Sequence, residues 1–495
     1  MDTRLLIVVL LSVGLIFAYQ ELVLKRLYPP VPAQQAQLNA SPGVQSSAGA
    51  PASETHETPE MVANSLIAEA PAAPARTIEV DTSRYDALLT TDGARLLSFR
   101  LKDYRVSAEP GSPWYQMVPE EPGGKLPLGL VLNRGGAIFT DSALNYASDA
   151  PAKLEATAGH PAVVTFTAKT RNGLEVTKSL AFDNDSYVFD LHATIAGAIA
   201  DVSQAGVSMN RSLIVRGSGY RDIPELQAYI GGKPLTESQK QLLKGNVSIA
   251  GPITYAGFGD RYFLTVYLPV EPHAGTVEMT YSEDEAHVRV LFNHALRLET
   301  GVYMGPKKLS IIEPINPALT KAIDFGLLSV IALPLLRALQ FFYRLVPNYG
   351  VAIILLTIVV RLATLPMSIK GQRSMMRMQR LQPQVERIRE KFKNDQERLN
   401  REMVDLYKRN HVNPLGGCLP MAVQLPILYG LYEAFLNAFE LRQAPFVGWI
   451  RDLSAPDCLK IPGMPMLPLT SCHGIPVLVI LLALTSFAQQ WISPK

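Results

Sequence analysis

Cysteine and charged residues are both scarce in this 495-residue chain. The three cysteines, Cys418, Cys458 and Cys472, have no CxxC spacing, which argues against zinc fingers, iron–sulfur sites and a disulfide scaffold. Charged residues make up 18% and hydrophobic residues 48% of the chain, whereas soluble proteins carry about 25% charged residues. The net charge is only +2, so the chain has no strong overall positive potential that would indicate nucleic-acid binding. We expect no DNA partner. This composition indicates a membrane protein with an attached soluble part.

Motifs of several enzyme and transporter classes are also absent. There is no GxxxxGKS/T loop, which argues against an ATP-driven transporter. No HExxH or GxSxG motif occurs, and no Ser/His pair falls within the apolar segments, so a membrane protease is poorly supported. Gly231-Gly232-Lys233 fits a turn rather than a phosphate loop. We therefore expect no enzymatic activity and no metal site.

The N-terminal region begins with an apolar run, Leu5 to Ala18. No small-x-small cleavage site follows it, so an uncleaved transmembrane anchor over residues 1–24 is favoured over a signal peptide. Residues 25–76 are rich in Pro, Ala, Ser and Gln, with too few apolar side chains to offset the entropy of ordering. We expect a disordered linker there.

Residues 77–313 have the pattern of short alternating strands. The runs AVVTFTAKT and LEVTKSLAF flank Asn172-Gly173, which predicts a hairpin with a type I′ turn. Later runs such as RYFLTVYLPV and AHVRVLFN keep the period of two. We expect a large, mainly antiparallel β-sandwich joined to an α-helical polytopic membrane core.

Helical periodicity replaces the strand pattern after the β domain. Four charged residues interrupt an apolar stretch over residues 314–347, which indicates an amphipathic helix in the membrane interface, bent at Pro334. A true span is the alternative. Beyond it we expect transmembrane helices at 348–368, 413–439 and 474–492, joined by a helical hairpin at 369–412 and a loop at 440–473.

The hairpin sets the predicted orientation. Between Ile369 and His411 there are about twelve Lys and Arg against about six Asp and Glu, so the positive-inside rule places this segment in the cytoplasm. The β domain then lies outside, on the opposite side of the membrane, and the N-terminus lies in the cytoplasm. The basic residues could bind ribosomal RNA, anionic lipid or acidic proteins, or only fix the topology; the candidates are Arg377, Arg380, Arg387, Arg389, Lys391 and Lys393.

Arg361 lies in the middle of the first predicted core span. A charge at the centre of a lone helix costs about 2.5–3.5 kcal/mol on insertion scales. Lys370 follows nine residues later, a distance of roughly 13 Å along a helix, so snorkelling leaves the guanidinium short of the aqueous boundary. The alternative is a wet cavity. Thr357 and Thr364 share the helix face of Arg361, and Gln424 lies on the next span.

Two motifs carry a resemblance to a known family. The segments NPLGGCLPMAVQLPI, Asn413 to Ile427, and ELRQAPFVGWIRDLSAPD, Glu440 to Asp457, closely resemble the YidC membrane protein insertase family in its Gram-negative form, which is related to the mitochondrial and chloroplast Oxa/Alb-type insertases. YGVAIILLTIVVRLATLP, LQPQVERIREKFKND and DFGLLSVIALPLL support the match. It covers nearly the whole layout and is most specific between Asp324 and Asp457.

The resemblance implies a function that the residues alone do not show. A member of this family is an insertase and chaperone that inserts, folds and assembles proteins of the inner membrane, some lipoproteins included, without a cofactor. Its partners are nascent membrane proteins, the lipid bilayer, the Sec translocon with its SecD, SecF and YajC accessory part, and the ribosome as a further candidate. An assembly scaffold or an ion-coupled transporter subunit remains the alternative, although no internal symmetry supports a transporter.

The resemblance also implies a setting for Arg361, namely a hydrophilic groove open to the cytoplasm and to lipid. Tyr429 and Tyr432 are candidate wall residues of this groove, and interfacial or packing roles are equally open. The family core has five spans after the interfacial helix, whereas three are predicted here, so we expect this chain to lack the last two.

The remaining prediction concerns the loop at 440–473 and its boundary. Cys458 and Cys472 fall on the predicted periplasmic side, where an oxidising environment permits a disulfide that closes a loop of about fourteen residues. Two free thiols are the alternative. Cys418 is expected at the cytoplasmic face and reduced.

Overall fold

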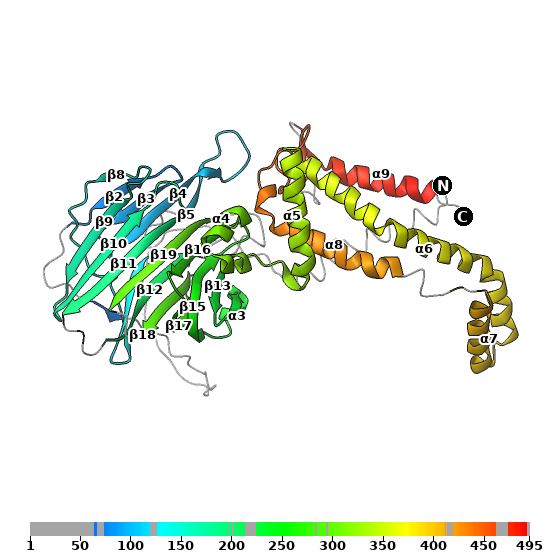
Figure 1. The fold of residues 1–495 in the computed structure, drawn as a ribbon, viewed down its shortest axis with the longest axis horizontal. Helices are drawn as coiled ribbons and strands as arrows, with labels where there is room; N and C mark the ends of the chain where they lie inside the picture. The colour runs from blue at the N-terminus through cyan, green and yellow to red at the C-terminus, as the bar shows by residue number, and fades with distance from the viewer. Residues whose placement is uncertain are drawn as a thin grey trace, which may run out of the picture. The chain divides into compact units, whose positions relative to one another are not determined.

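A computed structural model describes residues 64–66, 74–118, 126–197, 199, 202–212, 224–282, 285–293, 296–410, 412, 419–461 and 474–492 (Figure 1). The predicted anchor at 1–24 and most of the predicted linker at 25–76 lie outside these residues. The described residues form a β domain followed by a helical region.

The larger sheet of the β domain has 14 strands within the described residues, in the order β1-β7-β6-β12-β18-β17-β15-β16-β19-β11-β10-β9, with β13 and β14 attached beside β15. Its strands are β1 Asn64–Ser65, β6 Gly129–Arg134, β7 Ala137–Thr140, β9 Ala162–Lys169, β10 Leu174–Phe182, β11 Val188–Gly197, β12 Val202–Ser212, β13 Glu225–Ile230, β14 Lys233–Glu237, β15 Val247–Gly259, β16 Phe263–Pro269, β17 His273–Ser282, β18 Glu285–Asn293 and β19 Arg297–Pro306. A short helix, α3 Gln239–Leu242, follows β14.

The smaller sheet has the order β5-β4-β3-β2-β8. Its strands are β2 Thr77–Asp81, β3 Tyr85–Thr90, β4 Arg95–Arg105, β5 Trp114–Val118 and β8 Lys153–Glu155. In both sheets neighbouring strands pair antiparallel, except for β1 with β7 and β2 with β8 among the described strands. The predicted antiparallel β-sandwich is confirmed.

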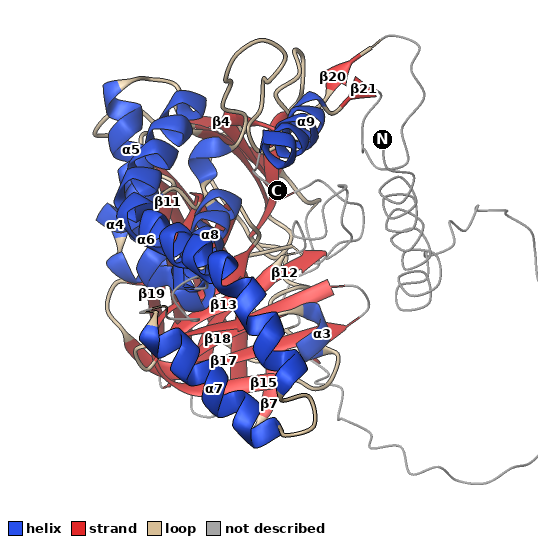
Figure 2. Ribbon diagram, turned by 90° about the vertical axis from the view of Figure 1, so that its right-hand side faces the viewer, coloured by secondary structure: helices blue, strands red, loops and turns tan. Residues whose placement is uncertain are grey.

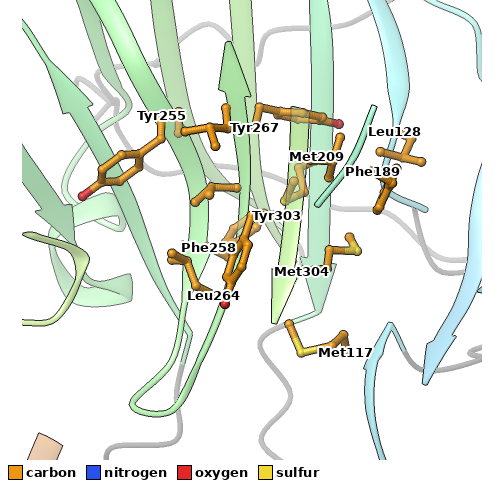
Figure 3. Close-up of a cluster of buried hydrophobic side chains, with 14 of the residues drawn as sticks. Met117, Leu128, Phe189, Met209, Tyr255, Phe258, Leu264, Tyr267, Tyr303 and Met304 are labelled. Atoms are coloured by element: carbon orange, nitrogen blue, oxygen red, sulfur yellow. The ribbon is translucent and has the colours of Figure 1, made fainter. Parts of the chain in front are cut away.

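Aromatic side chains from both sheets fill the space between them. The ring of Phe99 on β4 stacks on Tyr85 at 4.3 Å between centroids and lies 6.1 Å from Phe189 on β11. Tyr85 also meets Phe182 on β10 at 6.4 Å. Figure 3 shows another part of this core, which includes Met117 of β5. Each buried ring removes a large apolar area from water and so stabilises the sandwich.

The predicted hairpin around Asn172-Gly173 exists, but its turn type was wrong. Strands β9 and β10 pair in register, with Lys169 opposite Glu175. Among the described turn residues 170–173, only Gly173 has a positive φ, +72°, whereas a type I′ turn needs two such residues. Gly173 N–H donates to the carbonyl of Thr170, and Thr170 N–H to that of Leu174. This pattern is a type I turn with a glycine bulge, which also matches the right-handed strand twist.

A buried charged group ties the two sheets together. Lys178 on β10 is 1% exposed, and its Nζ donates to the Asp141 carboxylate at 2.9 Å and to the carbonyls of Gly93, Ala94 and Leu128. The other carboxylate oxygen of Asp141 accepts from Arg95 at the start of β4. Desolvation lowers the pKa of Lys178, and the Asp141 charge opposes that shift. Every donor of the ammonium has an acceptor, as a buried charge requires.

A second buried lysine, Lys307, lies where the β domain leads into the helical region. Its Nζ donates to Gln227 Oε1 and to the carbonyl of Ala322, both at 3.0 Å. A Cβ on Gly259 would lie 2.6 Å from this Nζ, so the glycine makes room for the ammonium. Burial lowers the pKa of Lys307 to about 8.

We expect this lysine to make the β domain more stable in mild alkali. An unfolded lysine keeps its proton up to a pKa of about 10.5, whereas Lys307 in the fold loses it above about 8. Between these values the unfolded state binds more protons, so stability rises with pH. The gain from about pH 8 to about pH 9.5 should be about 1–2 kcal/mol.

Pulse proteolysis in urea on the detergent-solubilised chain would measure this gain. Lys307→Met should be less stable overall and should lack this part of the pH dependence. Parallel pH curves for the two proteins would contradict the assignment.

The helical region contains α4 Leu309–Ile315, η2 Pro317–Ala322, η3 Gly326–Leu328, α5 Ser329–Leu345, α6 Tyr349–Lys391, α7 Gln396–Arg409, α8 Leu419–Asn437, η5 Phe439–Leu441 and α9 Val477–Ile492, with a two-stranded ladder of β20 Leu459–Lys460 and β21 Gly474–Ile475. The segment predicted as one interfacial helix, 314–347, is therefore divided: α5 begins at Ser329, after short helical turns. Pro314 and Pro317 lie where α4 ends and η2 begins, because proline lacks the donor that a continuing helix needs.

Helix α6 unites two segments that the sequence analysis separated. The expected span at 348–368 and the first arm of the expected hairpin at 369–412 form one 43-residue helix that runs through Pro366 and Pro383. Each proline removes one backbone hydrogen bond, which bends a long helix without ending it. Among the described residues, α6 is the one helix long and apolar enough to cross a membrane, and α9 is apolar but shorter. Spans at 413–439 and 474–492 stay predictions, and α8 and α9 lie within them.

Candidate functional site around Arg361

The site rests on the packing of α5, α6 and α8, which contact one another (Figure 1). Their buried residues are Ala332, Leu336 and Leu339 on α5, Ala352 and Leu356 on α6, and Ala434 on α8. A Cβ on Gly430 of α8 would lie 2.7 Å from Ile331 Cγ2 on α5, so glycine allows the two helices to approach closely. On α6 the buried residues of this group lie in its first turns, and the further buried residues Gly371, Leu381 and Val385 lie beyond Arg361.

Arg361 lies just beyond these first turns of α6. After Leu356, the next buried residue of α6 is Gly371, and Arg361 between them is exposed. Within the described residues, its guanidinium has no hydrogen bond or ion pair. The hydroxyl groups of Thr357 and Thr364 donate to carbonyls of their own helix, at Ile353 and Val360. The arginine therefore has both donors and charge available for another group.

The predicted residues of α8 form the neighbouring wall. Tyr429 and Tyr432 are exposed, with ring centroids 6.4 Å apart, and Gln424 is half-buried. Gln424 and Arg361 lie on helices that contact each other, and no hydrogen bond joins the two side chains among the described residues. Exposed apolar side chains surround Arg361 on α6, namely Ile358, Leu362 and Leu365. The arrangement offers one positive charge and several polar groups within an apolar surface.

Polar residues that the sequence analysis did not single out hold the packed end together. Glu440 in η5 is buried and accepts from the side-chain amide of Gln340 on α5 at 2.8 Å. Asn437 donates to the carbonyl of Asp324 and to Glu433. A charged residue inside the apolar run of α8, such as Glu433, was the signal available in the sequence. These groups join α5 to the end of α8.

The hairpin that was predicted to lie in the cytoplasm is built from the second half of α6 and from α7. Leu381 and Val385 are buried on α6, as the helical spacing predicts. The side chain of Asp395 caps α7 by accepting from the N–H of Arg398. All six predicted contact residues, Arg377, Arg380, Arg387, Arg389, Lys391 and Lys393, are exposed. The hairpin therefore presents a basic surface, and no group of metal ligands occurs among the described residues.

The loop after α8 contacts the β domain. The ring of Phe439 lies against Tyr104 and Phe263, at 5.2 and 5.7 Å between centroids. The Arg442 guanidinium lies 5.2 Å from the Phe263 ring and 5.5 Å from the Tyr115 ring. Burial lowers the pKa of Arg442, and arginine is effectively always protonated in proteins. The charge is therefore retained over the aromatic faces.

Cys458, in the same loop, is disulfide-bonded. Its predicted partner, Cys472, lies outside the described residues, and so does Cys418. The pairing of Cys458 with Cys472 stays a prediction.

Comparison with known families and proteins covers both parts of the chain. The family model for the YidC periplasmic domain matches residues 77–338, and that for the 60Kd inner membrane protein matches residues 341–495. Similar proteins include the membrane protein insertase YidC of Geotalea daltonii, which is 33% identical over 92% of this chain and 86% of its own length. The insertase YidC of Syntrophobacter fumaroxidans is 33% identical over 84% of this chain and 77% of its own length.

Solved structures resemble the β domain only distantly. A galactose mutarotase-like protein from Lactobacillus casei aligns with 46% of this chain and 99% of its own, at 10% identity and a TM-score of 0.29. A mutarotase-related enzyme from Lactobacillus acidophilus aligns with 46% of this chain and 97% of its own, at 7% identity and a TM-score of 0.31. Neither value supports an inference about chemistry. The matches to both family models and to relatives along most of their length show that the chain belongs to the YidC membrane protein insertase family.

Proposed function

We propose that this chain inserts proteins into the inner membrane through a groove lined by α6 and α8, with Arg361 as its fixed charge. Membership of the family supports three parts of this proposal: membrane protein insertion as the activity, the inner membrane as the location, and a periplasmic position for the β domain. The groove and its residues are the part of the proposal that concerns this chain.

The observation that carries the groove is the change in burial along α6. Its first turns are packed against α5 and the loop after α8, where a Cβ on Gly350 would lie 2.1 Å from the Phe446 ring. Between Leu356 and Gly371 no residue of the helix is buried: Val360, Thr364, Met367 and Ser368 are half-buried, and the others, Arg361 among them, are exposed. Such an arrangement closes the site at the periplasmic end and leaves it open toward the cytoplasm and the bilayer.

A groove of this kind lowers the barrier that a substrate meets. A polar tail that crosses about 30 Å of hydrocarbon must shed its water, and each unpaired polar group costs several kcal/mol. A wet site shortens the apolar path, and the positive charge of Arg361, which has no ion pair with any residue that the structure describes, attracts an acidic tail. The exposed Tyr429, Tyr432 and Leu362 offer apolar contact to the incoming span.

The proposal extends to the partners that membership of the family implies. Nascent membrane proteins and the lipid bilayer are the substrates and the medium, and larger substrates would be inserted beside the Sec translocon and its SecD, SecF and YajC part. The exposed basic hairpin is the part suited to a ribosome. The proposed topology is multi-pass, with the N-terminus in the cytoplasm, and the activity uses no cofactor and extends to some lipoproteins.

Reconstitution tests the proposal. The purified chain in liposomes should protect a short single-span substrate from added protease well above the level in empty liposomes. A matched control uses the same substrate with two charged residues placed in its span, since each adds about 2.5–3.5 kcal/mol to insertion. Equal protection with and without the chain would contradict insertase activity.

A further inference from the structure

The loop between β4 and β5 lies against the residues that follow α8. The Arg442 guanidinium donates to the carbonyl of Arg105 at 2.6 Å, and the Gln443 amide donates to the same carbonyl at 2.8 Å. Arg105 is the last residue of β4. The base of the β4–β5 hairpin is therefore fixed next to the end of α8.

The tip of the hairpin is fixed next to the start of α9. Glu109 in the tip forms an ion pair with Lys460 of β20. Strand β20 pairs with β21, with Lys460 opposite Gly474, and α9 begins at Val477, directly after β21 (Figure 2). Asp457 also accepts from the N–H of Leu478 in the first turn of α9.

The same loop is fixed to the start of α6 as well. The side chain of Asn348, which caps α6, donates to the carbonyl of Phe446 at 3.1 Å. The Phe446 ring also packs on Gly350. Contacts with all three helices thus place the hairpin and the loop at one level, next to the ends of α6, α8 and α9 at which a bilayer would begin.

Apolar side chains are exposed at this level. Val106 and Trp114 of the β4–β5 hairpin are 55% and 36% exposed, and Val447 and Trp449 of the loop are 63% and 37% exposed. Leu459 and Ile461 are exposed too. Trp449 donates its indole N–H to Asp457 at 2.9 Å, so its polar edge is satisfied and its ring is free to contact apolar groups. We call these six residues the docking surface.

Cationic side chains accompany the docking surface. The Arg105 guanidinium lies 3.9 Å from the centre of the Trp114 ring and donates to the carbonyl of Ser112. Arg451 is exposed, and Lys460 is exposed beside Glu109. Tryptophan with arginine or lysine is the combination found at the headgroup layer of bilayers, since the ring takes apolar contact while the cation meets phosphate.

We propose that the docking surface rests in the headgroup layer of the outer leaflet of the inner membrane, so that the periplasmic β domain binds the bilayer directly. The occupant is lipid, because the surface is continuous with helices whose exposed faces are apolar and because its cations match phosphate. A periplasmic domain attached in this way is held against the bilayer by the β4–β5 hairpin in addition to its covalent connection. Its position is then set by lipid as well as by protein contacts.

Tryptophan fluorescence tests the proposal, because the chain has only three tryptophans, Trp114, Trp449 and Trp491. The double substitution W449F/W491F leaves Trp114 as the sole reporter. In proteoliposomes, replacing phosphatidylcholine by its brominated form should cause about a twofold loss of Trp114 emission, as for a ring at the headgroup level. Iodide should quench Trp114 less in proteoliposomes than in the chain unfolded by urea without detergent.

A matched control places the reporter on an edge strand of the larger sheet. Val163 on β9 is exposed, and the variant V163W/W114F/W449F/W491F should show no quenching by brominated lipid. Adding Val106→Asp and Val447→Asp to the Trp114 reporter should abolish its quenching while trypsin resistance of the β domain is unchanged. The proposal would be overturned if brominated lipid left the Trp114 emission unchanged and iodide quenched it as strongly as in the unfolded chain. Quenching by lipid is measured without substrate, so it is independent of insertase activity.

Discussion

Replacing Arg361 with alanine should reduce insertion of single-span substrates with acidic tails by about tenfold. A unit charge about 12 Å away in a medium of effective dielectric about 20 contributes about 1.4 kcal/mol, which corresponds to about tenfold in rate. Arg361 has no hydrogen bond or ion pair among the described residues, so its removal leaves no partner behind there. The measurement is protease protection of the substrate in proteoliposomes.

The controls separate charge from fold. Arg361→Lys should keep most of the activity if charge suffices and lose it if the planar guanidinium is needed. Arg344→Ala removes an exposed arginine of α5 and should leave insertion unchanged. Neutral-tailed substrates should be affected less than acidic ones by Arg361→Ala. Equal insertion of acidic-tailed substrates by the Arg361→Ala variant and the unmodified chain would reduce Arg361 to a topological role.

The substitution Lys178→Met should destabilise the β domain by about 3–5 kcal/mol, the cost of breaking a buried ion pair on one side only. It leaves the carbonyls of Gly93, Ala94 and Leu128 without their shared donor and removes one partner of Asp141. The loss should appear as a lower urea midpoint for protease resistance of the β domain in the solubilised chain.

An exposed lysine gives the comparison. Lys169 pairs across strands with Glu175, and both side chains are more than half exposed, so Lys169→Met should cost less than about 1 kcal/mol. The double variant K178M/D141N should be less destabilised than the sum of the two single variants, because the uncompensated charge is removed with its partner. Additive losses would show that Lys178 and Asp141 do not act as a pair.

The strands of the β domain could be predicted from the sequence because a strand that is buried on one face has an apolar residue at every second position. Strand β10 shows this directly, since Leu174, Val176 and Leu180 are all buried. The same pattern places Lys178 on the inward face, and this signal was overlooked. The type I′ turn at Asn172-Gly173 was wrong because the sequence does not show whether one or two turn residues take a positive φ.

The helical region was predicted less well where proline was concerned. Pro366 was expected near the end of a span, yet α6 continues through it, because a proline inside a long helix removes one backbone hydrogen bond and bends the helix without having to end it. Conversely, the break before α5 was not expected. The site around Arg361 came from one charged residue in an apolar run, whereas the partners Gln340 and Glu440 meet only through tertiary packing.

The unbroken course of α6 has a mechanical consequence. At about 1.5 Å per residue the helix is about 65 Å long, and the buried residues of its first turns are Gly350, Ala352 and Leu356. When the helix pivots about these turns, a sideways push at its far end, where the predicted hairpin begins, displaces Arg361 by about a fifth as much, given its place along the helix. Pro366 and Pro383 lie between Arg361 and the far end of the helix. The stiffness of the helix at these two prolines therefore sets how much of that motion reaches the arginine.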